Sequence, residues 1–292
     1  MTAKCKQGAN LTRGISAIFL AALILSIFQR TAYADETRNF IALDYEILLN
    51  GLPVADLQVD ASLGRHSYDL SSTLWTRGVM DIILGFKSIA HAQGRIESAP
   101  GKLIVGPETH GDDNVWMEEE RKVRIVYGPV GPIKTHVSPL PANEGRDEVS
   151  AELRRDTRDL LSAALQLSLL AQDGSVCESH NKVFDGRRRY DLIFSPGEIE
   201  GAALTSEGSH GSVFLCDGKL VRLAGRSAEP WLPRSKAPKE FQLWMNQIDP
   251  DLPPVPFRLK AFSGIGWLVA QLATHSREPR SEETETVEEV AD

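Results

Sequence analysis

Apolar and polar residues alternate along the first part of the chain with a period of two. Every second position from Ile41 to Leu49 carries a large apolar side chain, as expected of a strand with one face against a core. Asn50-Gly51 ends this run and predicts a two-residue hairpin turn, with residues 52–60 as the partner strand. A third strand is predicted at 66–75, with Tyr68, Leu70 and Leu74 on one face.

The same kind of pattern continues through most of the chain. Residues 78–86 fit either a short helix or a buried strand. Turn-forming pairs separate the other segments: Pro-Gly at 100, Gly-Pro at 106 and a Gly/Pro-rich stretch at 128–132. Two Asp-Gly pairs, at 185–186 and 217–218, predict further two-residue turns. Additional strands are predicted near 89–96, 102–105, 115–127, 133–137, 240–247 and 255–274.

One segment has the character of a helix. Asp156, Thr157 and Asp159 precede a leucine-rich run, and Gly174 follows it, which predicts a helix over about 158–171. Its apolar residues leave little polar face, so the helix should be buried against protein on nearly all sides. The predicted fold is therefore mainly β. We expect a strongly curved antiparallel sheet, or an open barrel or β-spiral, that wraps one buried helix within a single domain spanning 38–274.

The two ends of the chain differ from this body. Three cations precede an apolar run of 14 residues, Ile15–Phe28, and Ala32-Tyr33-Ala34 follows. This is the pattern of a secretory signal peptide over 1–34, cleaved near Ala34-Asp35; an uncleaved anchor is the alternative. We therefore expect a periplasmic protein with no stable membrane span after cleavage. Residues 275–292 are predicted to be a disordered tail, since the last twelve include six acids and no base.

Cleavage of the leader would change both the net charge and the number of cysteines. Loss of the leader removes four cations and no acid, which changes the formal charge from −8 to −12. A net-negative body argues against nucleic acid as a partner. Cys177 and Cys216 then remain as a pair in an oxidising compartment, which predicts a disulfide that closes a loop of 40 residues. Such a loop closure is worth roughly 3–4 kcal/mol. Two free thiols are the alternative.

Patterns that could carry chemistry are weak. Ser179 and Lys182 match the Ser-x-x-Lys motif of serine–lysine enzymes, but they lead into a strand, where residues three apart face opposite sides. Residues 109–113 offer a histidine and two aspartates, although Gly-Asp-Asp-Asn is also ordinary turn composition. Glu118, Glu119 and Glu120 read as a solvated run inside a strand. We predict no catalytic residue, no metal site and no cofactor, and the sequence favours a non-enzymatic role.

Three consecutive arginines, Arg187, Arg188 and Arg189, follow Asp185-Gly186. A two-residue turn would pair Phe184 with Arg187, Val183 with Arg188 and Lys182 with Arg189. Lys182 and Arg189 would then be like charges side by side, which is unfavourable unless acids or an anion lie nearby. Two alternatives stay open. The arginines pair with the acids at 185, 191 and 118–120, or they bind an anionic headgroup or a partner.

Several stretches together resemble the bacterial family called domain of unknown function 3108. They are Asp159–Leu165, then Cys177, then Val183-Phe184-Asp185-Gly186-Arg187-Arg188-Arg189-Tyr190-Asp191-Leu192, then Cys216 with Ala224-Gly225, and finally Pro256–Leu259 and Gly264–Gly266. The chain departs from the family at Thr157-Arg158, where an Asp-Pro-Leu-Ser type sequence is expected. The resemblance implies an exported, mainly β protein without an established reaction. By analogy it is similar in class to periplasmic β-spiral proteins of the envelope.

These observations lead to one functional expectation and two alternatives. We expect a non-enzymatic periplasmic protein that supports cell-envelope integrity by binding a lipid or a hydrophobic segment in the concave face of the sheet. The first alternative is a periplasmic hydrolase that modifies the envelope. The second is a structural or adaptor protein that binds other envelope proteins through its tail or sheet edges.

Overall fold

A computed structural model describes residues 38–198, 213–226 and 238–280. The predicted signal peptide at 1–34 and residues 281–292 of the predicted tail lie outside these ranges. The helices are α2 (Val79–Leu84) and α3 (Leu160–Gln172), with short 3₁₀ turns η2 (Pro141–Glu144) and η3 (Val176–Glu178). Among the residues that the structure describes, no helix is both long enough and apolar enough to cross a membrane.

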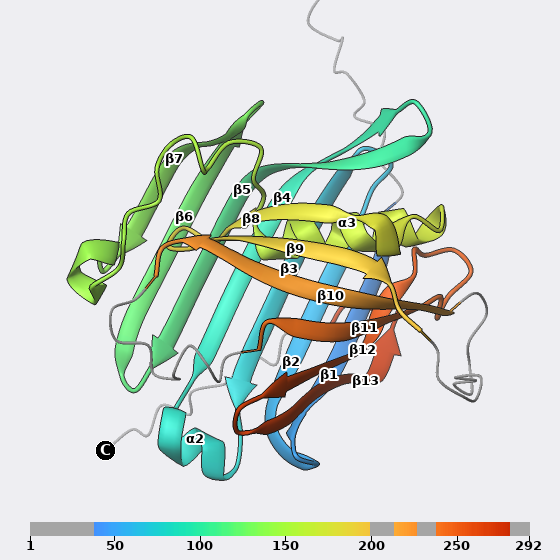
Figure 1. Cartoon of the computed structure of the whole chain (residues 1–292). Helices are drawn as coiled ribbons and strands as arrows, with labels where there is room; N and C mark the ends of the chain where they lie inside the picture. Colours follow the sequence, from blue (N-terminus) through green and yellow to red (C-terminus); the bar gives the residue numbers. More distant parts are fainter. Residues whose placement is uncertain (1–37, 199–212, 227–237, 281–292) are drawn as a thin grey trace, which may run out of the picture. The chain divides into compact units, whose positions relative to one another are not determined.

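Thirteen strands of the described ranges form one antiparallel sheet (Figure 1). They are β1 (Asn39–Leu49), β2 (Leu52–Leu63), β3 (Ser67–Thr76), β4 (Lys87–Ala99), β5 (Lys102–Trp116), β6 (Glu119–Gly128), β7 (Gly131–Ser138), β8 (His180–Phe184), β9 (Arg189–Pro196), β10 (Val213–Ala224), β11 (Glu240–Asn246), β12 (Val255–Ser263) and β13 (Gly266–Ser276). Their order is β7-β6-β5-β4-β3-β2-β1-β13-β12-β11-β10-β9-β8. The first and last strands thus pair in the middle of the sheet, while β7 and β8 are its unjoined edges.

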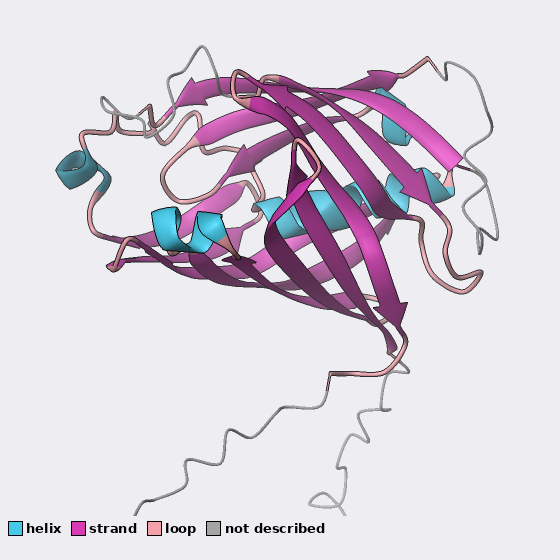
Figure 2. Cartoon of the chain, turned by 90° about the horizontal axis from the view of Figure 1, so that it is seen from below, coloured by secondary structure: helices cyan, strands magenta, loops and turns pink. Residues whose placement is uncertain are grey.

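Strong curvature brings the two halves of this sheet over one another, with α3 between them (Figure 2). Leu165 and Leu169 of the helix pack in a core cluster with Tyr68 and other residues of β1–β5. Its Leu167 and Ala171 pack in a second cluster that includes residues of β8–β11. The helix is apolar nearly all round because both sides face a sheet layer. The mainly β fold with one buried helix is confirmed.

The N-terminus of α3 is held by a buried polar chain. Asp159 is the N-cap, and its Oδ1 accepts the Ser162 N–H at 2.8 Å, which satisfies one of the free donors of the first turn. The Ser162 hydroxyl donates to Asp159 Oδ2 at 2.5 Å. Because that proton is used, the Tyr68 hydroxyl of β3 donates to Ser162 Oγ at 2.8 Å. Burial strongly raises the pKa of the Tyr68 phenol, so it stays neutral.

The middle of α3 is tied to the free part of one strand. Residues 102–108 of β5 have a strand neighbour on one side only, since β6 pairs with β5 from Thr109 onward. Gln166 fills the other side. Its Oε1 accepts the Val105 N–H and its Nε2 donates to the Leu103 carbonyl, each at 2.9 Å. A side-chain amide therefore replaces the missing strand.

Several sequence expectations need correction. The Gly106-Pro107 pair does not end a strand, because β5 runs on to Trp116 past a register shift opposite Gln93/Gly94; a bulge is where a strand accommodates proline. Residues 109–113 therefore lie in a strand and form no turn. The chain reverses at Met117-Glu118, both at positive φ, inside the segment 115–127 that was expected to be continuous.

The second Asp-Gly pair was also misinterpreted. Asp217-Gly218 lies inside β10, opposite Gln242 and Phe241. A Cβ at Gly218 would lie 2.3 Å from the Phe241 ring, so the glycine permits close packing and does not form a turn. The ordered body also extends beyond residue 274. Strand β13 ends at Ser276, and Arg280 bonds to Asp44 and Asp60. Within the ambiguous segment 78–86, Val79–Leu84 form the short helix α2.

Candidate functional site

The candidate site is built on the loop between β8 and β9. Phe184 pairs with Arg189, Val183 with Tyr190 and Lys182 with Asp191. The predicted register, with a two-residue turn and Lys182 opposite Arg189, is wrong by two residues. The loop has four residues, 185–188, because Asp185 Oδ1 accepts the N–H groups of Arg187 and Arg188 at 3.0 and 2.7 Å. An aspartate bonded to the backbone two and three residues on widens the turn, and the expected like-charge contact does not arise.

Arg187 is buried and fully engaged within the protein. Its guanidinium donates to the carbonyls of Ser138 and Pro139 at 2.8 and 2.9 Å and to Glu144 at 3.1 Å. Glu144, from η2, also pairs with two other arginines, Arg121 at 2.7 Å and Arg146 at 3.0 Å. The acid that meets Arg187 is therefore Glu144, which lies outside the expected run 118–120. Burial lowers the pKa of Arg187, and the charges of Arg121 and Arg146 add to that effect against Glu144.

Arg189 is a second internal link. Its side chain is almost entirely buried and donates to the Leu153 carbonyl at 2.9 Å and to the Tyr190 carbonyl at 2.6 Å. It also forms a short ion pair with Asp191, whose Oδ2 lies 2.8 Å from His180 Nε2. Since its donors are used on the backbone, Arg189 fastens the segment before α3 to the edge strands.

Arg188 differs from its two neighbours because 55% of its side chain is exposed. Asp185 Oδ2 accepts its Nε at 2.7 Å. This attraction holds the pKa of Arg188 above its usual value against the opposing effect of burial. For Asp185, burial would raise the pKa, but the Arg188 charge and the two loop N–H groups hold it below its usual value. The other two guanidinium nitrogens of Arg188 form no hydrogen bond or ion pair within the described residues.

Arg188 lines a pocket of about 160 Å³ together with residues at the end of β10. The lining residues are Arg188, Tyr190, Leu220, Arg222, Ala224, Gly225 and Arg226. Arg222 and Arg226 are exposed, and no acid of the described ranges pairs with either. Burial lowers the pKa of Arg222, and the nearby charge of Arg188 lowers it further. Three arginines thus line one pocket beside apolar residues, with Asp185 as their one ion-pair partner in the described residues.

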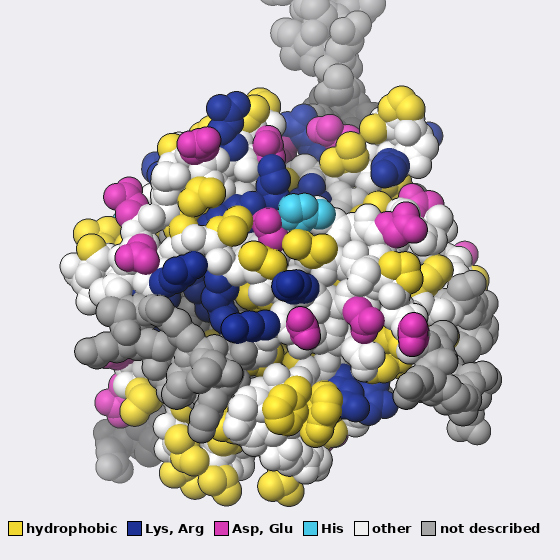
Figure 3. Space-filling view, in the orientation of Figure 1, with side chains coloured by type: hydrophobic (Ala, Val, Ile, Leu, Met, Phe, Trp, Pro, Cys, Tyr) yellow, Lys and Arg dark blue, Asp and Glu magenta, His cyan; other side chains and the backbone are white. Residues whose placement is uncertain are grey.

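Gly225 makes this meeting geometrically feasible. It has φ +75°, and a Cβ there would lie 2.0 Å from the Arg187 carbonyl oxygen. The end of β10 therefore approaches the 185–188 loop more closely than any other residue would allow. Arg146 donates to the Gly225 carbonyl at 3.3 Å and adds a further cation. Figure 3 shows Lys and Arg side chains gathered on the left half of this face.

The disulfide lies behind the same strands. Cys177 of η3 and Cys216 of β10 are bonded, at a sequence separation of 39, as expected from the sequence. Cys216 is fully buried in the core cluster that contains Val183 and Tyr190. The bond joins the chain just before β8 to the first part of β10, at the ends of these strands away from the 185–188 loop.

The other candidate residues are not brought together for chemistry. The Ser179 hydroxyl donates to the Val176 carbonyl at 2.7 Å, while the Lys182 ammonium is 3.8 Å from Asp156. His110 is buried with Nδ1 at 3.6 Å from Asp159. Among the described residues, no three potential ligands are placed to hold a metal ion.

Glu119 and Glu120 form ion pairs with their strand neighbours. Glu119 lies 3.0 Å from Arg121, and Glu120 lies 3.1 Å from Lys122. Both carboxylates are largely exposed at the start of β6, whereas Glu118 lies in the turn before it. These groups are solvated partners of surface cations.

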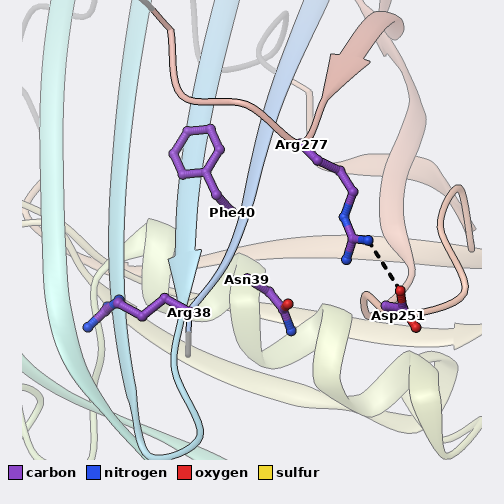
Figure 4. A pocket seen from close by; sticks show the side chains of 5 residues that line it. All are labelled: Arg38, Asn39, Phe40, Asp251 and Arg277. Carbon is purple, nitrogen blue, oxygen red and sulfur yellow. Dashed lines mark hydrogen bonds and ion pairs between the residues drawn. The ribbon is translucent and has the colours of Figure 1, made fainter. Parts of the chain in front are cut away.

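A larger and more open depression lies at the start of β1 (Figure 4). Its volume is about 610 Å³, and Arg38, Asn39, Phe40, Asp251 and Arg277 line it. Arg277 pairs with Asp251 at 3.2 Å and with Asp249 at 3.3 Å. Arg38 donates to Ser62 and Ser67. Because both cations are already committed, this depression offers less to a ligand than the arginine pocket does.

Comparison with known proteins gives little further information. No model of a known protein family matches the chain, and no curated protein matches it. The resemblance to domain of unknown function 3108 is therefore not confirmed. A solved structure described as a beta-barrel-like protein of domain of unknown function DUF1849 from Brucella abortus is 11% identical. That alignment covers 84% of this chain and 100% of that chain, with a TM-score of 0.41.

Proposed function

We propose that this chain is a non-enzymatic protein of the bacterial periplasm that supports the cell envelope by binding an anionic lipid headgroup in the arginine pocket. The leader-like residues 1–34 support export. The stretch from Val183 to Leu192 and the two cysteines support a relationship to domain of unknown function 3108. The observation that carries the proposal is the meeting of Arg188, Arg222 and Arg226 in one pocket.

Arginine suits this role because its planar guanidinium binds phosphate oxygens through two parallel hydrogen bonds. Arg222 and Arg226 have no ion-pair partner among the described residues, so their donors are available to a ligand. Leu220 and Tyr190 supply an apolar wall next to the charges, which fits the glycerol and first methylenes of a lipid. We place the ligand here and not in the concave face, because α3 occupies that face.

Vesicle binding tests the proposal directly. The chain from Asp35 is mixed with vesicles of phosphatidylcholine alone or of phosphatidylcholine and phosphatidylglycerol in equal parts, and bound protein is measured by flotation. The variant R222Q/R226Q removes two exposed charges. Each cation near an anionic surface is worth ~1 kcal/mol, so binding to the anionic vesicles should weaken by about 30-fold.

The matched control is R65Q/R155Q, which removes two other exposed arginines and should bind like the unmodified chain. Equal weakening in both variants, or equal binding to neutral and anionic vesicles, would overturn the proposal. Titration with inorganic phosphate separates two sources of the same chemistry. A lipid headgroup site binds vesicles more tightly than free phosphate, whereas a site for small anions binds both alike.

The cellular role has its own test. A deletion strain should become more sensitive to detergent and to cell-wall antibiotics, and the unmodified gene, but not one encoding R222Q/R226Q, should restore resistance. The hydrolase alternative finds less support. Asp159, Ser162 and His110 do cluster, but all three are buried, and the serine hydroxyl bonds to the aspartate and not to the histidine.

A further inference from the structure

Exposed apolar side chains lie along one end of the strands, where the chain turns from one strand to the next. The connections between β1 and β2, β3 and β4, β5 and β6, and β12 and β13 all lie at this end, because the strands alternate in direction. Each carries large apolar residues in contact with water. We call Leu52, Val79, Ile82, Ile83, Met117, Ile265 and Trp267 the apolar rim; their exposed fractions range from 45% for Ile265 to 88% for Ile82.

The rim is continuous along the sheet. Its four connections belong to eight neighbouring strands, β6 to β12 in sheet order, which at about 4.8 Å per strand span ~34 Å. A backbone hydrogen bond from Met117 to Leu84, at 3.1 Å, joins α2 to the β5–β6 turn, and one from Arg77 to Val54, at 3.0 Å, joins the chain before α2 to β2. Asn50 joins the β1–β2 turn to β13 through the Trp267 N–H at 2.9 Å.

Helix α2 is the clearest sign that this end of the strands meets something apolar. None of its six residues is buried, although Val79, Ile82 and Ile83 are branched aliphatics. Glycines at positive φ, Gly78 and Gly85, bound it on both sides. Exposed apolar surface of this kind marks an interaction site, and Met80 and Leu84 are the only apolar residues of α2 that are even partly buried.

The charges at the same end indicate which partner this is. The β8–β9 loop and the end of β10 lie at this end too, since β10 pairs with β11 and β11 with β12 in alternating directions. The arginine pocket therefore lies at the same end of the strands as the apolar rim. In Figure 3 hydrophobic side chains gather along the lower margin, with cations above them. The Lys260 ammonium lies 4.2 Å from the Trp267 ring centroid, an arrangement suited to the headgroup layer.

We propose that the apolar rim inserts into the surface of a bilayer containing anionic lipid, while the arginine pocket holds a headgroup of the same leaflet. This inference rests on the proposed function. Hairpin turns and a short helix can enter the headgroup layer of a bilayer without leaving backbone groups unpaired. Their backbone groups bond to one another and to the neighbouring strands. Insertion is shallow, on the order of the 5–10 Å reached by interfacial helices.

Fluorescence quenching tests the insertion. Vesicles of phosphatidylcholine and phosphatidylglycerol in equal parts are prepared with bromine on the acyl chains, which quenches tryptophan only at that depth. Emission of the bound chain should be quenched, and W267F should lose most of the quenching while it still binds. The variant I82S/I83S should bind these vesicles at least about tenfold more weakly, because two aliphatic side chains no longer enter the lipid.

The matched control is V130S/I133S, which changes two exposed apolar residues outside the rim and should bind and quench normally. Each variant should keep the circular dichroism and urea midpoint of the unmodified chain. If I82S/I83S binds vesicles normally and no quenching occurs, the rim proposal is overturned while the headgroup pocket stands. If R222Q/R226Q also binds normally, the proposed function fails independently. A dimer that I82S/I83S converts to a monomer would assign the rim to a second copy and overturn insertion.

Discussion

Asp185 bonds to Arg188 at two places. Its Oδ1 accepts the Arg188 backbone N–H, and its Oδ2 accepts the side-chain Nε, both at 2.7 Å. One carboxylate therefore sets both the shape of the β8–β9 loop and the position of a cation in the pocket. The loop and the candidate site are parts of the same local structure, so changes to Asp185 should affect both.

Replacing Asp185 should separate these two roles. D185N keeps an oxygen that can accept from the loop N–H groups, whereas D185A leaves them without an acceptor. We expect D185A to lose ~1–3 kcal/mol of unfolding free energy and D185N clearly less, measured by urea denaturation. Equal losses would show that charge, and not the backbone acceptor, dominates. Both Asp185 variants should bind the anionic vesicles more tightly than R222Q/R226Q does.

Acid should weaken the protein through the same carboxyl group. The pKa of Asp185 is below its ordinary value of 3.8 in the folded chain, so its contribution is fully present above about pH 4 and is lost as pH falls through the lower, folded pKa. The urea midpoint should therefore fall on going from about pH 6 to about pH 3, and fall less in D185N. Identical pH profiles for the two chains would contradict this assignment.

The hydrogen bond between Tyr68 and Ser162 should couple β3 to the start of α3. Y68F removes only the hydroxyl, and S162A removes its acceptor together with the bond to Asp159. Each should destabilise by ~1–2 kcal/mol, and the double variant by less than the sum, with a coupling of ~1 kcal/mol. The matched control is Y45F, whose hydroxyl donates to the Pro256 carbonyl instead; it should be additive with S162A.

Two glycines at positive φ allow a comparison of backbone strain with steric contact. Gly186 has φ +88°, and a Cβ there would lie 2.5 Å from a Val123 methyl, whereas Gly101 has φ +75° with nothing within 4 Å. G101A should cost ~1 kcal/mol through its backbone alone. G186A should cost more, because Val123 must shift as well. Equal urea midpoints for the two variants would argue against a tight contact at Gly186.

Removal of the disulfide should lower stability without changing the fold. The loop between Cys177 and Cys216 predicts a loss of roughly 3–4 kcal/mol on reduction, measured as a lower thermal midpoint with a reductant present. C177A/C216A should show the lowered midpoint without the reductant and no further change with it. A reductant effect that persists in this variant would have another cause.

Much of the fold could be predicted from local patterns. Alternation from Ile41 to Leu49 and the Asn50-Gly51 turn identified β1 and its partner because one face of that hairpin is buried and the turn needs positive φ. The apolar helix was identified because it packs on both sides. The errors share a cause. Gly106 and Gly218 suggested breaks or turns, but β5 and β10 continue through them. A Gly-Pro or Asp-Gly pair alone does not distinguish a turn from a bulge or a close contact inside a strand.

Only part of the candidate site could be predicted from the sequence. Three arginines in a row are conspicuous, and the expected pairing with the acids at 185 and 191 holds for Arg188 and Arg189 but not for Arg187. Their different surroundings depend on residues far along the chain: Glu144 in η2, Arg222 in β10 and Arg226 just after β10. These residues meet through strand pairing and through Gly225, and no local spacing indicates such a meeting. The register error at 185–188 arose because the Asp185 side chain bonds to the loop in addition to the backbone bond between Asp185 and Arg188.

Pairing of β1 with β13 has a kinetic consequence. Asp44 lies opposite Thr274, and Leu49 opposite Leu268, so the strand that begins the sheet waits for the one made last. Until then both halves carry an open edge at the centre, and contacts so distant in sequence form slowly. The pairing at the centre of the sheet can therefore form only after β13 has been made, whereas the hairpins from β1 to β7 need no later strand.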